Sequence, residues 1–284
     1  MTASTPAPAA ISETAYAKIN LALHVRSRRA DGYHEIESLF AFCEDGDALT
    51  GSLRNDGALA LTLDGPFAAG LESDERNLVL RAARALRDAA GVGLGADLHL
   101  TKHLPVAAGI GGGSADAAAA LRLLVRLWGI NPAMIDFPRL AVSLGADVPA
   151  CLSSMTVFGT GVGERLEPVD CDSADRPVLL VNPGVACPTG PVFSGWDGVD
   201  RGPLDPARWR AGRNDLTASA IALVPEIAQV LAGLEQQAGA ALVRLSGSGA
   251  TCFALFDDKA ARDAARAAIR KAHPGWWMMA SRLR

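Results

Sequence analysis

The sequence has neither an excess of basic residues nor a long apolar run. Its 284 residues carry 27 Lys and Arg against 31 Asp and Glu, a formal net charge of −4. Nucleic-acid-binding proteins usually show a basic face, so this balance argues against a nucleic-acid partner. No segment reaches the roughly 18 uninterrupted apolar residues that a membrane span needs. With 49% hydrophobic and 20% charged residues, the composition predicts a soluble globular protein that binds neither nucleic acid nor membrane.

Cysteine is also scarce, and the chain has no C-x-x-C pair. The five cysteines are widely spaced, at Cys43, Cys151, Cys171, Cys187 and Cys252. This odd, scattered set is typical of reduced thiols in a cytoplasmic protein and argues against a disulfide framework or a zinc site. The opening MTASTPAPAAISET lacks the basic and apolar regions of a signal peptide, so we predict a disordered leader over residues 1–14.

The first regular pattern lies in residues 15–25, AYAKINLALHV, where apolar and polar positions alternate. The alternation predicts a strand with one buried face, whose other face offers Lys18 and Asn20 side by side. A turn at residues 30–32 leads to a second predicted strand, GYHEIESLFAF. Residues 48–63 then predict a hairpin around the Asn-Asp-Gly turn at 55–57.

Helical patterns follow. Residues 77–91 predict a helix that ends at its terminal glycine, and residues 96–105 predict a strand. Residues 114–128 and 132–144 predict two further helices. The second of these ends in the segment GADVP.

The second half of the chain shows the order β-α-β-β-α-β. The predicted strands are RPVLLV, AALVRL, TCFALF and WWMMASRL, and the predicted helices cover residues 214–237 and 258–273. This order is that of a ferredoxin-like domain. Gly, Pro and Asp punctuate residues 160–176, so we predict a boundary there, between domains of residues 15–165 and 166–284.

Four glycines in five positions precede an alanine-rich helix in PVAAGIGGGSADAAAAL, residues 105–121. Glycines let a chain wrap closely round a ligand, and a helix N-terminus presents unpaired N–H groups and a partial positive charge. With Ser114 as the predicted N-cap, the segment is suited to an anion, above all phosphate. A Walker loop is excluded because no lysine precedes Ser114, and a Rossmann fingerprint because its third glycine is missing. On this segment alone, a flexible connector stays open.

Four segments together resemble the GHMP kinases, a superfamily of small-molecule kinases. PVAAGIGGGSADA resembles their phosphate loop, GADVPACL their catalytic-aspartate motif and RLSGSGATCFALF their third glycine motif. AYAKINLALHVRSRRADGYHEIESLF resembles one family within them, the 4-diphosphocytidyl-2-C-methyl-D-erythritol kinases. The resemblance implies an α+β, two-domain GHMP kinase fold, with an N-terminal ribosomal-S5-like domain, a C-terminal ferredoxin-like domain and the active site in the cleft between them.

The resemblance further implies that ATP, with Mg²⁺, phosphorylates the 2-hydroxyl of 4-diphosphocytidyl-2-C-methyl-D-erythritol, in the non-mevalonate route to isopentenyl diphosphate. It implies Asp147 as the catalytic base and Lys18 as its partner. In isolation, Asp147 would be loop punctuation and Lys18 a solvated strand lysine. A lysine beside an aspartate favours the ionised carboxylate, so we expect Asp147 to orient the acceptor hydroxyl and to take its proton late.

For the nucleotide, the resemblance implies two positions on the adenine side, Asn77 and Lys102, which in isolation would be a helix N-cap and a surface lysine. The implied phosphate-loop positions are Pro105, Gly109, Gly111, Gly112, Gly113, Ser114 and Ala115. The glycine turn at residues 247–249 would complete the cleft wall, although a plain hairpin turn explains it nearly as well. Mg²⁺ would be largely water-coordinated, and no protein ligand for it is predicted.

For the acceptor, the resemblance implies a substrate with a cytidine diphosphate moiety. Tyr33 would stack on the cytosine and His34 would supply hydrogen bonds, roles that suit a ring with a π-face and a polar edge. Asn20 would help to position the substrate, and Thr189 would lie at the methylerythritol end. In isolation, Tyr33 and His34 would be loop-tip residues.

Two other functions stay open. One is another GHMP kinase, of the homoserine or mevalonate type, and the motif D-G-Y-H argues against it because those substrates carry no base to stack. The other is a catalytically inactive ligand sensor, which the presence of both Lys18 and Asp147 argues against. His99 and His103 share a strand face but lack a third ligand, so we predict no metal site there. We expect a cytoplasmic protein, a monomer or a weak homodimer.

Overall fold

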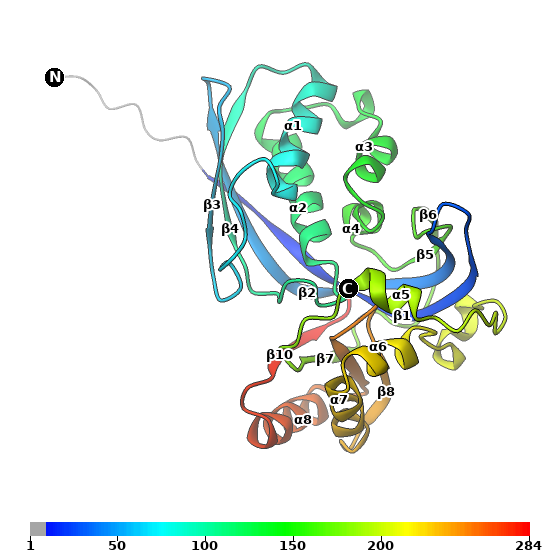
Figure 1. The fold of residues 1–284 in the computed structure, drawn as a ribbon. Helices are drawn as coiled ribbons and strands as arrows, with labels where there is room; N and C mark the ends of the chain where they lie inside the picture. The colour runs from blue at the N-terminus through cyan, green and yellow to red at the C-terminus, as the bar shows by residue number, and fades with distance from the viewer. Residues whose placement is uncertain (1–9) are drawn as a thin grey trace.

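Residues 10–284 are described by a computed structural model, in which two sheets carry the helices (Figure 1). The first sheet has six strands in the order β3-β4-β2-β5-β6, with β1 paired to β2. The second has four strands in the order β10-β7-β9-β8. In Figure 1 the first sheet and its helices form the upper half of the molecule, and the second sheet with its helices forms the lower half.

The first sheet is built on two long antiparallel strands. They are β1 (Ile11–Arg28) and β2 (His34–Arg54). The shorter strands are β3 (Leu59–Asp64), β4 (Gly95–Thr101), β5 (Val157–Thr160) and β6 (Arg165–Pro168). The predicted strand over residues 15–25 is therefore confirmed within β1. Lys18, Asn20 and His24 on its polar face are buried as well, so β1 is covered on both faces in this stretch.

Helices cover one face of this sheet (Figure 1). They are α1 (Leu78–Ala90), α2 (Gly112–Leu127), α3 (Phe137–Leu144) and α4 (Val148–Ser153), with a 3₁₀ turn η1 (Pro132–Met134) before α3. α2 is the central one, and its alanines from Ala117 to Ala120 are fully buried. Such small side chains let α2 lie close against β1 and β2, which places its N-terminus beside the polar residues of β1.

The start of β1 corrects the predicted leader. The strand begins at Ile11, inside the segment 1–14, while residues 1–9 lie outside the described residues. Ile11 pairs with Gly51 of β2, and the Glu13 carboxylate is bound by Arg122 and Arg126 of α2. These partners are distant in sequence, so composition alone could not indicate them.

The predicted hairpin over residues 48–63 is wrong. β4 lies between β2 and β3, antiparallel to β2 and parallel to β3. The Asn-Asp-Gly turn at 55–57 therefore leads β3 away from β2 instead of pairing the two strands. The reason is burial: Leu98 and Leu100 of β4 complete the core beside Leu49 of β2, a position that the half-exposed β3 would fill less well.

The helix boundaries are partly as predicted. α1 is confirmed, with Asn77 accepting the N–H of Val79 at 2.9 Å and Gly91 ending the helix at φ +64°. α2 begins at Gly112, so Ser114 lies in its first turn, and the predicted N-cap role of Ser114 is wrong. The predicted helix over 132–144 is interrupted, because Asp136 caps a new helix, α3, after η1.

The second half of the chain forms the predicted ferredoxin-like arrangement. Its strands are β7 (Pro177–Asn182), β8 (Ala240–Leu245), β9 (Cys252–Phe256) and β10 (Trp277–Arg282), all antiparallel to their neighbours. Its helices are α5 (Thr189–Ser194), the 3₁₀ helix η2 (Pro206–Ala211), α6 (Thr217–Leu223), α7 (Glu226–Glu235) and α8 (Lys259–Ala272). The single helix predicted over 214–237 is wrong, since the chain breaks at Val224 before Pro225, a residue type that disfavours a preceding helical residue.

An apolar layer joins the two halves. Ile19 and Leu21 of β1 share a buried cluster with Leu180 of β7 and Phe253 of β9. The main chain adds to the junction, as the N–H of Leu23 donates to the Arg213 carbonyl at 2.8 Å. The predicted domain division after residue 165 falls inside β6 and stays a prediction.

Two negative findings concern the described part of the chain. None of its helices is both long and apolar enough to cross a membrane. All five cysteines are free thiols, as the sequence predicted, and four of them are buried.

Candidate active site

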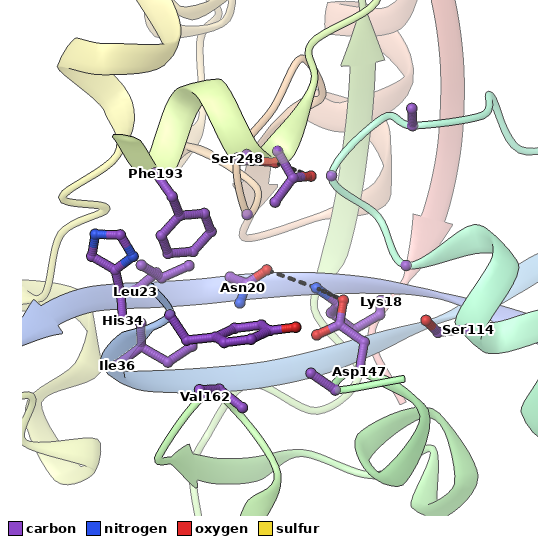
Figure 2. Close-up of a pocket in the computed structure, with 18 of the residues that line it drawn as sticks. Lys18, Asn20, Leu23, His34, Ile36, Ser114, Asp147, Val162, Phe193 and Ser248 are labelled. Atoms are coloured by element: carbon purple, nitrogen blue, oxygen red, sulfur yellow. Dashed lines mark hydrogen bonds and ion pairs between the residues drawn. The ribbon is translucent and has the colours of Figure 1, made fainter. Parts of the chain in front are cut away.

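A cavity of about 710 Å³ lies between the two halves of the molecule (Figure 2). Its walls come from β1, the turn before β2, the glycine-rich segment with the N-terminus of α2, the residues before α4, α5 and the turn before β9. Most of the candidate residues from the sequence line it: Lys18, Asn20, Tyr33, His34, Gly109, Gly111, Gly112, Gly113, Ser114, Asp147 and Thr189, together with Gly247 and Ser248. Segments far apart in the sequence thus meet at one cavity.

Lys18 and Asp147 form an ion pair at the centre of the cavity. Lys18 Nζ lies 3.2 Å from Asp147 Oδ2 and donates to Asn20 Oδ1 at 3.0 Å (Figure 2). The Lys18 side chain is only 4% exposed, whereas that of Asp147 is 38% exposed. The carboxylate therefore faces the cavity, and the ammonium supports it from the wall.

Asn20 holds this centre in place. Its Nδ2 donates to Ser38 Oγ at 2.7 Å, and Ser38 in turn donates to the carbonyl of Ala22. With its amide nitrogen bound in this way, Asn20 points its Oδ1 toward Lys18 and accepts a hydrogen bond from the ammonium group. The backbone N–H of Asn20 donates to Ser246 Oγ at 3.3 Å, so the second half of the molecule also contacts this point.

The position of Asp147 follows from local structure. It precedes α4 at the N-cap position, but its side chain makes no capping hydrogen bond among the described residues. Gly145, two residues before it, ends α3, and Pro149 lies in the first turn of the short α4. An aspartate at a helix start would normally cap; here the carboxylate points to Lys18 instead, so it is available for chemistry.

The glycine-rich segment is fastened to the turn before β9. Ser246 Oγ donates to the Gly109 carbonyl at 2.9 Å, and the N–H of Thr251 donates to the Ala108 carbonyl at 3.1 Å. Gly109 has φ +74°, and a Cβ on it would meet backbone atoms of Ser246 and Gly249. Only glycine suits this close approach, because both the backbone angle and the space exclude a side chain.

The N-terminus of α2 opens into the same cavity. Gly112, Gly113 and Ser114 form its first turn and line the cavity wall. Gly111 stands at the N-cap, and within the described residues no side chain caps the helix. The N–H groups of a first helical turn have no intrahelical partner, and they carry partial positive charge. This end of the cavity is therefore a binding place for an anion.

The opposite end of the cavity is apolar and aromatic. His34 lies against Phe193 of α5, with ring centroids 5.2 Å apart, and Leu23 and Ile36 lie beside them (Figure 2). Burial, and secondarily Arg28, lowers the pKa of His34, so its imidazole is neutral at physiological pH. A neutral imidazole offers one N–H donor and one acceptor nitrogen.

Tyr33 and Thr189 lie on the rim of this end. The Tyr33 residue is 63% exposed, and its backbone N–H donates to Asp31 Oδ1 at 3.1 Å. Thr189 Oγ1 lies 3.0 Å from Ser248 Oγ, which joins α5 to the turn before β9. The hydroxyls of Thr189 and Ser248 thus supply polar groups next to the aromatic wall.

Four candidates do not line the cavity: Asn77, Lys102, Pro105 and Ala115. Asn77 caps α1, and its Nδ2 donates to the Glu72 carbonyl at 2.8 Å. The side chain of Lys102 is buried beneath the glycine-rich segment, where it pairs with two carboxylates. Lys102 is therefore not the surface lysine that its residue type suggests.

The described residues include no group of three or more His, Cys, Asp or Glu side chains arranged to hold a metal ion. His99 Nε2 pairs with Asp64 Oδ2 at 3.2 Å, and its Nδ1 lies 2.8 Å from Thr62 Oγ1. His103 follows the end of β4, so the two histidines do not share a strand.

Sequence reasoning missed several residues of the cavity. Phe193, Leu23, Ile36 and Val162 form its apolar end, and no motif distinguishes them from ordinary core residues. Ser246, which does not line the cavity but fastens the glycine-rich segment beside it, was also missed, although the pattern S-G-S-G contained it and could have indicated it. Such residues are recognised only when the fold brings their segments together.

Comparisons with known proteins agree with this geometry. Residues 77–155 match the GHMP kinases N terminal domain, and residues 204–275 match the GHMP kinases C terminal domain. The 4-diphosphocytidyl-2-C-methyl-D-erythritol kinase of Rhizorhabdus wittichii is 56% identical over 96% of this chain and 94% of its own length. The kinase of the same name from Novosphingobium aromaticivorans is 52% identical over 96% and 93%.

The chain is also similar to solved structures of kinases. A crystal structure of 4-(cytidine 5'-diphospho)-2C-methyl-D-erythritol kinase is 34% identical, with a TM-score of 0.80 over 96% of this chain and 99% of that chain. The homoserine kinase of Cytophaga hutchinsonii shares the fold at 18% identity, with a TM-score of 0.69 over 99% and 96% of the two chains.

Proposed function

The chain belongs to the GHMP kinases and, within them, to the 4-diphosphocytidyl-2-C-methyl-D-erythritol kinase family, and on this premise we propose that it phosphorylates the 2-hydroxyl of 4-diphosphocytidyl-2-C-methyl-D-erythritol with ATP. The reaction would serve the non-mevalonate route to isopentenyl diphosphate. The observation that carries the proposal is the ion pair of Lys18 and Asp147, which lies between an anion-binding helix end and an aromatic end of one cavity.

The phosphates of ATP would bind at the N-terminus of α2. The N–H groups of Gly112, Gly113 and Ser114 would donate to phosphate oxygens, and the glycines let the phosphates approach the backbone. Gly109 and Gly111 would shape the approach. The roles of Asn77, Lys102, Pro105 and Ala115 toward the nucleotide stay predictions.

Asp147 and Lys18 would act on the acceptor hydroxyl. The exposed carboxylate of Asp147 can accept a hydrogen bond from the hydroxyl, orient it toward the γ-phosphate and take its proton as the new O–P bond forms. Lys18, at 3.2 Å from that carboxylate, would help to balance the negative charge on the transferring phosphoryl group. Asn20 keeps the Lys18 ammonium in this position.

The acceptor's cytosine would lie at the aromatic end. There Tyr33 could cover one face of the base, and His34, neutral and held against Phe193, could pair with its polar edge. The hydroxyl of Thr189 would lie toward the methylerythritol part. An acceptor bound in this way would reach from the aromatic end to Asp147, where its hydroxyl would meet the γ-phosphate of ATP.

Mg²⁺ fits the cavity only as an ion held mainly by phosphate oxygens and water. The described residues form no cluster of three ligands, and among the side chains that line the cavity next to the α2 N-terminus, Ser114 and Asp147 offer oxygen atoms of the right kind. Such sparse protein ligation is usual for Mg²⁺ in kinases. When bound, the ion would balance charge on the phosphates.

The predicted cytoplasmic location and the predicted monomer or weak homodimer stay predictions.

The test is substrate-dependent release of ADP by the purified protein, compared with Asp147→Asn. We expect turnover with the diphosphocytidyl substrate and a fall of kcat by about 10²–10⁴-fold in the variant, because the proton acceptor is lost. Asp88→Asn is the matched control, since that carboxylate is 77% exposed on α1, away from the cavity. Turnover of homoserine or mevalonate instead would contradict the assignment of the aromatic end, and nucleotide binding without turnover would indicate a sensor.

A further inference from the structure

A cluster of three charged side chains lies buried beneath the phosphate-binding end of the cavity. Lys102, after β4, contacts the carboxylates of Asp47 in β2 and Asp116 in α2, the latter at 2.7 Å. Their exposed fractions are 2%, 0% and 5%. Charged side chains are rarely buried this deeply unless they are paired, so the group is a built feature and not a surface ion pair.

The two carboxylates hold different parts of the anion site. Asp47 Oδ1 accepts the backbone N–H groups of His103 and Leu104, at 2.6 and 2.8 Å, and so fixes the chain that enters the glycine-rich segment. Asp116 is the fifth residue of α2, and it ties the start of that helix to Lys102. Asp116 Oδ1 has no hydrogen-bond partner within the described chain, so Lys102 is its main counter-charge.

The cluster is separated from the cavity by little more than Gly112. A Cβ built on Gly112 would lie 3.5 Å from Lys102 Nζ, and Gly112 itself lines the cavity. Any charge in the cluster therefore acts on an anion at the α2 N-terminus through a thin, poorly solvated layer, where electrostatic interactions are strong.

The net charge of the cluster depends on Lys102. Two carboxylates and one ammonium leave at most one net negative charge below a site that would bind a polyphosphate. Burial, and secondarily the charge of Asp47, raises the pKa of Asp116, whereas Lys102 opposes that rise. Without the ammonium, two carboxylates would compete with the phosphates for the positive end of α2.

We propose that Lys102 is a positioning residue that acts from beneath the glycine-rich segment: its buried ammonium lets Asp47 and Asp116 anchor that segment and α2 without repelling the nucleotide's phosphates. This inference rests on the proposed function and deepens it, because it assigns to Lys102 an electrostatic task that needs no contact with the ligand. The affected property is the affinity for phosphate-bearing nucleotides, and it should depend on the charge of the ligand.

The experiment measures the affinity of the full-length protein for ATP, ADP and AMP by calorimetry, in the variants Lys102→Met, Asp116→Asn and Lys102→Met/Asp116→Asn. Lys271→Met, which removes an exposed lysine of α8, is the matched control. Thermal unfolding of each variant shows that it is folded at the temperature of the titration.

We expect Lys102→Met to weaken ATP binding on the order of tenfold or more, because it removes one positive charge from beneath the phosphates where the effective dielectric constant is well below that of water. The loss should shrink from ATP to ADP to AMP. Asp116→Asn alone should bind ATP at least as tightly as the unaltered protein, because it removes a negative charge, and the double variant should recover most of the lost affinity.

Three results would overturn the inference: an equal loss for all three nucleotides, a loss of ATP affinity in Asp116→Asn alone, or no recovery in the double variant. Each would indicate that the cluster only supports the fold or that Lys102 contacts the ligand directly. If Lys102→Met does not fold, Asp116→Asn alone still decides, since support of the fold and charge balance predict opposite changes. Failure of the unaltered protein to bind any nucleotide would instead contradict the proposed function.

Discussion

Replacement of Gly109 by alanine tests how the two halves of the molecule build the phosphate site. Gly109 has φ +74°, and an added Cβ would lie against the Ser246 carbonyl and 2.7 and 2.8 Å from O and N of Gly249. All three are backbone atoms, so no side chain can move aside. Either the glycine-rich segment or the turn before β9 must shift, and the Ser246 hydrogen bond to the Gly109 carbonyl would be strained.

The magnitude has two parts. A left-handed alanine costs about 1–2 kcal/mol, and overpacking against fixed atoms typically costs a further ~1–3 kcal/mol. Gly91→Ala isolates the first part, because Gly91 has φ +64° but a Cβ added to it would meet no atom of the described residues within 4 Å. We therefore expect a loss of about 1–2 kcal/mol of unfolding free energy for Gly91→Ala and about 2–5 kcal/mol for Gly109→Ala.

The assays are urea-induced unfolding for stability, with ATP affinity and kcat measured under conditions where both variants are folded. Gly91→Ala should keep the affinity and kcat of the unaltered protein, whereas Gly109→Ala should lose ATP affinity by more than about tenfold, or 1.4 kcal/mol. If both variants lose the same stability and neither loses ATP affinity, the contact between Gly109 and the turn at residues 246–249 does not shape the phosphate site, and the reasoning is refuted.

Three further predictions concern other parts of the chain. Lys18→Met should lower kcat about 10²-fold with little change in thermal unfolding, because it removes a counter-charge and keeps the volume; an unchanged kcat would contradict its role. Burial, and then the charge of Arg213, lowers the pKa of His24, and the Arg213 N–H donates to its Nε2, a bond that only the neutral ring can accept; the contact of Nδ1 with the Gly202 carbonyl opposes this shift in part. Its stabilising effect is present above the unfolded pKa of about 6.5 and is lost as the pH falls through the depressed folded value, so urea unfolding between pH 7.5 and 5 should show a smaller decline in His24→Gln. A thiol reagent should modify Cys171 first in the folded protein, since burial raises the pKa of Cys43, Cys151 and Cys252; rapid modification of all five thiols would contradict this packing.

The local structure was the most predictable part of the fold. Helix α1 begins after the capping amide of Asn77 and ends at the left-handed Gly91, as its sequence predicts. The order of elements in the second half likewise predicted the ferredoxin-like sheet. The errors fall where a long-range partner overrides a local pattern. The Asn-Asp-Gly turn resembles a hairpin turn, but the pairing of β4 with both β2 and β3 separates those strands. Ser114 is a good capping residue, but the glycines before it can enter the helix themselves.

The candidate site shows the same division. The glycine-rich segment is conspicuous by its spacing, and the alternation in β1 places Lys18 and Asn20 on one face. The roles of Lys18, Asn20 and Asp147 follow only from the resemblance to the GHMP kinases. Phe193 and Ser246 could not be found, because an apolar residue on a short helix and a serine in a turn have no distinctive pattern. The resemblance places Lys102 on the adenine side. In the structure its buried ammonium group forms ion pairs with the carboxylates of Asp47 and Asp116.

The sequence by itself indicated most of the longer strands and helices, where bare backbone can wrap an anion, and which charged side chains share the polar face of the first strand. These properties depend on neighbouring residues and on periodicity, which are local. Only the tertiary structure decided that Asp147 lies 3.2 Å from Lys18, that Ser246 fastens Gly109, and that Lys102 is buried beneath the glycine-rich segment. The first and third of these contacts arise from packing within the first half, where the core brings β1, β2, α2 and α4 together, and the second arises from the apolar layer between the two halves. Such packing sets which distant segments meet.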